Sequence, residues 1–173
     1  MAASDSPALP VAHVLLRILI VLNWLMGAAI MVLLLAMPTR QWIMSALELS
    51  SSPETDRIIL GLRTIAVIGL ATIPINHVIL RRLLQIVETV RSGDAFDALN
   101  AVRLRTIAWA VLALQLIGLV IGAIASKIST SAHPLNIDAG FSITGWLAVL
   151  LLFVLSRVFA EGARMRDELE GTV

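Results

Sequence analysis

Residues 81–105 read RRLLQIVETVRSGDAFDALNAVRLR, and this charged stretch decides how the rest of the chain is expected to fold. Long apolar runs flank it, two before it and two after it. The 173 residues are 58% hydrophobic and only 14% charged, whereas soluble domains carry about 25% charged residues. This composition predicts a single membrane domain in which stretch 81–105 joins two helical hairpins.

The apolar runs are long enough to cross a membrane. A spanning helix needs about 20 mainly apolar residues to cross roughly 30 Å of hydrocarbon, and the expected spans are residues 12–37, 58–80, 106–126 and 139–156. The first run is expected to be retained as a span, because no basic residue precedes it in Met1–Pro10. The predicted fold class is all-α: a polytopic membrane protein, arranged as a four-helix bundle with a connector helix in 81–105 and a helical tail at 157–173.

Local signals set the expected helix ends. A helix is expected to begin near Pro53, since Pro is favoured in a first turn, and to continue past the second span as an amphipathic segment ending at Arg91. Gly93 is typical of the residue just after a helix. Either Asp97 or Asn100 is expected to cap the third span.

The C-terminal tail is predicted to prolong the fourth helix into water. Its charges form three i,i+4 pairs, which stabilise an exposed helix: Arg157–Glu161, Arg164–Glu168 and Arg166–Glu170. A thin apolar stripe remains between these charges: Val158, Met165 and Leu169. We expect this stripe to dock on the apolar face of residues 83–90.

The charge distribution predicts an orientation, because short loops rich in Lys and Arg stay in the cytoplasm. The connector and the tail carry eight basic residues: Arg81, Arg82, Arg91, Arg103, Arg105, Arg157, Arg164 and Arg166. The other two loops carry three: Arg40, Arg57 and Lys127. The protein is therefore expected to be a multi-pass protein of the bacterial inner membrane, with both termini in the cytoplasm.

Three polar side chains inside the expected spans are candidates for an intramembrane site: Asn23, Arg63 and Gln115. An ionisable residue in a span suggests a functional site, so Arg63 could bind an anion or a proton. In the alternative, which its shallow depth favours, Arg63 extends to the membrane surface or pairs with Asp56 or Asp138. Asn23 and Gln115 fall at matched depth, which favours a hydrogen bond between their helices; the alternative is a shared polar path.

Other features are less specific. His13 and His77 both fall near the cytoplasmic edge, where a pH-sensing role is conceivable, but no spacing supplies a metal site. Gly118, Gly122 and Ser126 form a small-residue ladder that permits close helix packing, within the bundle or across a homo-oligomer. The chain has no cysteine and no nucleotide-binding or hydrolase motif. We expect no enzyme activity, no cofactor and no direct nucleic-acid binding.

Two stretches resemble the patterns of a known family. Residues 93–96 read GDAF and are followed by Asn100 and by RLRTIA at 103–108, which resembles a G-x-P-F…N…L-R-x-I pattern. Residues 159–173 read FAEGARMRDELEGTV and resemble an F-x-x-G-x-x-L…E-L-T-V ending. Both resemble the bacterial four-span membrane proteins grouped as domain-of-unknown-function family 2975. The resemblance implies no established activity, but it does imply a helix-turn-helix regulator as a partner, because such regulators are often encoded beside family members.

Two hypotheses for function follow. The first is a regulatory or interaction protein whose connector and tail bind a soluble cytoplasmic partner through Phe96, Arg103, Arg105, Gly162, Arg164 and Arg166. In the purely structural alternative, the tail simply docks on the connector. The second hypothesis is a small transporter or channel that uses Arg63, Asn23 and Gln115 as a polar path.

Overall fold

The computed structural model describes residues 8–36, 53–94, 97–128 and 141–170 of the chain. These residues form helices and no strand: α1 (Ala8–Ala36), α3 (Pro53–Arg91), α4 (Ala98–Ile128) and α5 (Ile143–Glu170). Each of these helices is long and apolar enough to cross a membrane. Over the described residues, the predicted all-α class with four helices able to span a membrane is confirmed.

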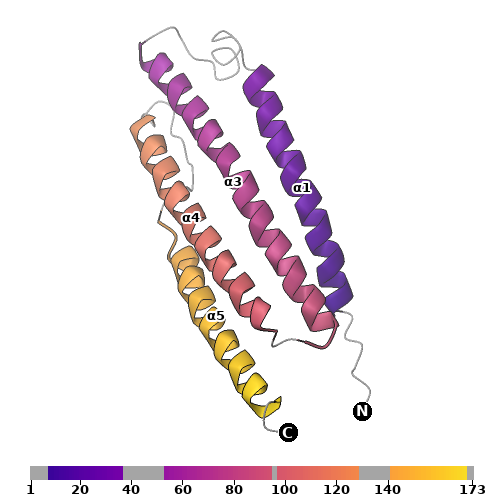
Figure 1. The fold of residues 1–173 in the computed structure, drawn as a ribbon. Helices are drawn as coiled ribbons and strands as arrows, with labels where there is room; N and C mark the ends of the chain where they lie inside the picture. The colour runs from indigo at the N-terminus through magenta and orange to yellow at the C-terminus, as the bar shows by residue number, and fades with distance from the viewer. Residues whose placement is uncertain (1–7, 37–52, 95–96, 129–140, 171–173) are drawn as a thin grey trace.

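The helices lie in an open row and not in the closed bundle that the sequence suggested (Figure 1). Among the described residues, α1 packs on α3, α3 on α4 and α4 on α5, and no other pair of helices is in contact. Both broad faces of this layer are apolar. No residue in the most apolar part of α1 is buried by the other helices. Closure is not required in a membrane, since lipid chains are as apolar as the side chains of a packed core.

One glycine sits at each contact between neighbouring helices. A side chain on these glycines would meet an atom of the adjacent helix, and the three facing pairs are Gly27–Ile73, Gly61–Ile128 and Gly145–Gln115. The contact at Gly61 is tight, because a Cβ there would lie 2.6 Å from Cγ2 of Ile128. These glycines let neighbouring backbones approach closely, as small residues do in membrane helix packing.

The helix boundaries mostly follow the sequence signals. Helix α3 begins at Pro53 and runs through Pro74 to Arg91 without interruption, as expected. Helix α5 begins at Ile143, later than the predicted start of the fourth span. The reason is Ser142, whose hydroxyl oxygen accepts a hydrogen bond from the Gly145 backbone N–H at 3.1 Å and so caps the helix.

The tail is helical as predicted, but it does not dock on α3. Helix α5 continues to Glu170 and packs on α4, while Val158 and Met165 of the expected stripe are 57% and 54% exposed. The side chain of Leu169 lies outside the described residues. The Arg164–Glu168 pair is confirmed at 3.1 Å.

The tight contact at Gly61 yields a testable prediction. We expect Gly61→Ala to destabilise the protein by about 1–2 kcal/mol, because the added methyl group must push Ile128 out of a packed site. Gly69→Ala is the matched control on the same helix, since nothing lies within 4 Å of a Cβ at Gly69. Free energies of unfolding in mixed micelles would check this, and equal effects of the two substitutions would contradict it.

Candidate functional site

The turn between α3 and α4 is fixed by backbone hydrogen bonds at both of its ends. At the end of α3, the Gly93 N–H donates to the Val90 carbonyl at 3.1 Å and the Asp94 N–H to the Thr89 carbonyl at 3.0 Å. Gly93 has φ +88°, a conformation that glycine adopts without strain. This is the Schellman arrangement, and it confirms the predicted role of Gly93.

Asp97 caps α4, which settles the choice between Asp97 and Asn100. The carboxylate of Asp97 accepts a hydrogen bond from the Leu99 N–H at 2.9 Å, and its backbone carbonyl accepts one from the Asn100 N–H at 2.8 Å. Asn100 lies in the first turn of α4, and its side chain bonds to α3.

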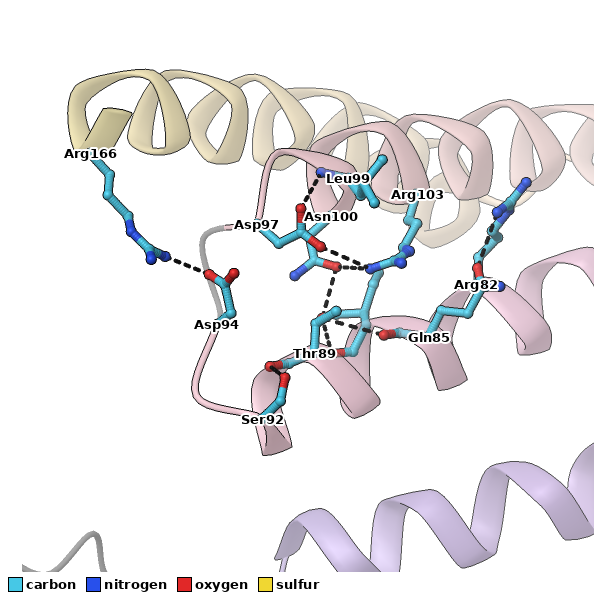
Figure 2. Close-up of polar contacts among 11 residues, drawn as sticks. Arg82, Gln85, Thr89, Ser92, Asp94, Asp97, Leu99, Asn100, Arg103 and Arg166 are labelled. Carbon is cyan, nitrogen blue, oxygen red and sulfur yellow. Dashed lines mark hydrogen bonds and ion pairs between the residues drawn. The ribbon is translucent and has the colours of Figure 1, made fainter. Parts of the chain in front are cut away.

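The Asn100 side chain joins α3 to α4 inside the protein. Asn100 is 0% exposed, and its Oδ1 accepts hydrogen bonds from the Thr89 hydroxyl at 3.0 Å and from the Arg103 guanidinium at 2.7 Å. Arg103 also lies 3.7 Å from the Asp97 carboxylate. Figure 2 shows this cluster between the two helices, and it sets their relative positions at this end of the layer.

Helix α5 reaches the same turn through one ion pair. Nη1 of Arg166 lies 2.5 Å from Oδ1 of Asp94, and Figure 2 shows the two side chains extended toward each other. Both side chains are nearly half exposed, so the pair contributes no more than about 1 kcal/mol. It nevertheless brings the end of the tail beside the α3–α4 turn.

On the other side of α3, two histidines contact neighbouring side chains. Nδ1 of His13 lies 3.9 Å from the Glu88 carboxylate, and Nε1 of Trp24 donates to Nδ1 of His77 at 3.2 Å. The histidines therefore contact different partners on the α1–α3 interface. Over the described parts of the chain, no group of three His, Cys, Asp or Glu residues is placed to hold a metal ion.

The structure separates the polar residues of the predicted membrane path. Asn23 donates to the Ile73 carbonyl at 3.0 Å, and Gln115 donates to the Ser142 carbonyl at 3.4 Å. The two amides do not bond to each other because α3 lies between their helices and α1 and α4 are not in contact. Arg63 is exposed on α3, ten residues before Ile73 and so about 15 Å away along the helix.

Two of the three residues of the predicted small-residue ladder, Gly118 and Ser126, do not pack against a neighbouring helix. Nothing lies within 4 Å of a Cβ at Gly118, and Ser126 is exposed. The close contacts of α4 instead involve Gly61 of α3 and Gly145 of α5. Sequence reasoning missed these two glycines because a single mid-helix glycine carries no spacing signal.

The candidate partner-binding residues differ in how exposed they are. Arg103 is held within the Asn100 cluster, with its side chain 16% exposed. Arg105, Arg164 and Arg166 are exposed, and Gly162 is half-buried beside the buried Ala163. Phe96 lies outside the described residues. Six exposed polar side chains at this end define what we call the connector surface: Ser92, Arg105, Arg164, Arg166, Asp167 and Glu168.

The sequence was compared with protein families, curated proteins and solved structures. A family model described as "Protein of unknown function (DUF2975)" matches residues 41–173. This match includes α3, α4 and α5 with their turn, and it confirms the resemblance drawn from the two sequence patterns. No curated protein and no solved structure gives a significant match.

The buried amide of Asn100 should be important for stability. We expect Asn100→Ala to destabilise the protein by about 2–3 kcal/mol, because it leaves the Arg103 guanidinium and the Thr89 hydroxyl without their shared acceptor. The measurement is the free energy of unfolding in mixed micelles. Ser126→Ala, at an exposed position of the same helix, should have little effect, and a comparable loss in both variants would argue against a special role for Asn100.

Proposed function

Because the chain belongs to the DUF2975 family of proteins of unknown function, we propose that it is a non-enzymatic regulatory protein of the bacterial inner membrane. In this proposal the connector surface faces the cytoplasm and binds a soluble partner. The family resemblance implies the class of that partner, a helix-turn-helix regulator that binds DNA. The membrane protein would hold the regulator and thereby control its access to DNA.

The observation that carries this proposal is the ion pair between Asp94 and Arg166. The two residues are 72 positions apart in sequence, and their contact brings the α3–α4 turn and the end of α5 together. The turn itself is held by the Schellman bonds and by the Asn100 cluster. A surface assembled from two rigid segments is preorganised, which lowers the entropic cost of binding a partner.

The exposed charges of the connector surface suit recognition of a polar protein. Both signs are present, because Arg105, Arg164 and Arg166 are exposed and so are Asp167 and Glu168. Such mixed charges favour specific orientation of a partner more than raw affinity. The transport hypothesis has no comparable support, since Asn23 and Gln115 lie on opposite sides of α3.

Reversing the charge of Arg166 should prevent capture of the partner. We expect Arg166→Glu to separate the tail from the turn by repulsion with Asp94, and so to reduce recovery of the soluble regulator at least about fivefold. The measurement is crosslinking in native membranes, followed by purification and identification of bound DNA-binding proteins. A truncation after Ser156, which removes the tail, should give the same loss.

Two variants control this experiment. Lys127→Glu makes the same charge change at the opposite end of the layer and should leave capture intact. The double variant Asp94→Arg/Arg166→Glu restores an ion pair and should recover part of the binding. Undiminished capture by membrane-inserted Arg166→Glu would refute the proposed surface.

The proposed orientation can be tested directly because the chain has no native cysteine. Ser92→Cys lies at the exposed α3–α4 turn and Lys127→Cys at the exposed opposite end of α4. With a membrane-impermeant maleimide added from the periplasmic side, we expect labelling of Lys127→Cys only. Labelling of Ser92→Cys in sealed cells would reverse the orientation and move the connector surface out of the cytoplasm.

A further inference from the structure

A hollow of about 290 Å³ lies on α3 at the connector end, apart from the connector surface. The described residues that line it are His77, Val78, Arg81, Arg82 and Gln85. His77 contacts Trp24 of α1. Gln85 lies one turn before Thr89, which bonds to α4. The hollow therefore crosses the exposed face of α3 between its two neighbouring helices.

The lining of the hollow is rich in hydrogen-bond donors and contains no acid among the described residues. Nη1 of Arg82 donates to Oε1 of Gln85 at 3.1 Å, which orients the guanidinium without neutralising its charge. Arg81 is exposed and makes no ion pair within the described segments. The hollow thus holds two uncompensated positive charges.

Three acids at this end of the protein contact side chains that do not line the hollow. Glu88 faces His13, Asp94 pairs with Arg166, and Asp97 lies beside Arg103. The acids of α5 are separated from α3 by α4, because α3 and α5 are not in contact. An anionic ligand would therefore meet no competing carboxylate among these contacts.

Its position along α3 places the hollow at the level of the lipid headgroups in a membrane. No charged residue occurs on α3 between Arg63 and Arg81, and an uncharged run of this length nearly fills the hydrocarbon thickness of roughly 30 Å. Arg81 and Arg82 are the first charges beyond that run. Trp24, which contacts His77 of the lining, is exposed and is of the residue type enriched at membrane interfaces.

From these observations we propose that the hollow binds the phosphate group of an anionic membrane lipid. Guanidinium groups match phosphate oxygens in geometry and donate paired hydrogen bonds to them. Basic pockets on membrane helices bind anionic headgroups in this way. Arg81 and Arg82 supply the charge, and the Gln85 carbonyl oxygen holds the Arg82 guanidinium in place. This site is independent of the proposed partner surface.

Native mass spectrometry of the purified full chain would test the proposal. The protein is titrated with phosphatidylglycerol or with phosphatidylcholine of the same acyl chains, whose choline cation opposes the two arginines. We expect preferential retention of phosphatidylglycerol. Arg81→Gln/Arg82→Gln should weaken it about 25-fold, since each basic residue near a lipid surface contributes about a fivefold factor.

The matched control removes two exposed arginines from the same end of the protein, outside both the hollow and the connector surface, in the variant Arg91→Gln/Arg157→Gln. It should retain the preference for phosphatidylglycerol. Equal losses in both double variants, or no preference in the wild type, would overturn the proposal. Circular dichroism and the elution volume confirm that each variant is folded. Displacement of lipid by millimolar inorganic phosphate would overturn the lipid assignment and identify free phosphate as the ligand.

Discussion

The side chain of Asn100 has no exposed surface, so its oxygen must find its hydrogen-bond donors inside the protein. Thr89 on α3 and Arg103 on α4 supply them. This pairing sets Thr89 opposite Asn100, and 28 residues farther along both helices Gly61 faces Ile128. The same antiparallel register is therefore kept from one end of the α3–α4 pair to the other.

This register explains why matched depth did not bring the two intramembrane amides together. Gln115 lies 15 residues after Asn100, and Pro74 lies 15 residues before Thr89, so Gln115 is level with Pro74. Asn23 bonds to Ile73, one residue away from the same level. Both amides thus lie at one depth, as the sequence indicated, but α3 stands between them. Depth follows from counting residues, whereas lateral order depends on which helices pack together.

The sequence was informative wherever a local physical rule decides the structure. Pro53, Gly93 and Asp97 mark helix ends because each has a distinct backbone preference or hydrogen-bonding capacity. The spans were found because hydrocarbon thickness imposes a length on them. Whether the helices form a closed bundle or an open row was not predictable in this way. An apolar helix face packs equally well against lipid chains and against another helix.

The candidate site could be predicted only in part, because a sequence pattern selects residues without showing what their side chains contact. Sequence patterns selected Asn100, Arg103 and Arg166, but they could not distinguish an arginine held within the protein from one available to a ligand. The structure makes that distinction through distances to acceptors, because Arg103 contacts Asn100 and Asp97 while Arg166 contacts Asp94. The prediction that the tail stripe docks on α3 was wrong, because α5 packs on α4 and does not contact α3.

The positive charges at the connector end therefore have two different physical settings. Arg103 and Arg166 lie beside Asp97 and Asp94 of the α3–α4 turn and so contribute to holding that turn in place. Arg164 pairs with Glu168 of its own helix. Arg81 and Arg82 have no such acid among their described contacts and lie where the apolar run of α3 ends. To set the orientation of a membrane protein, positive charges need only lie on the cytoplasmic side of the membrane. Arg81 and Arg82 lie together in one hollow, and Gln85 fixes the Arg82 guanidinium. Setting the membrane orientation does not require such an ordered arrangement. That order is the physical basis for assigning them a ligand.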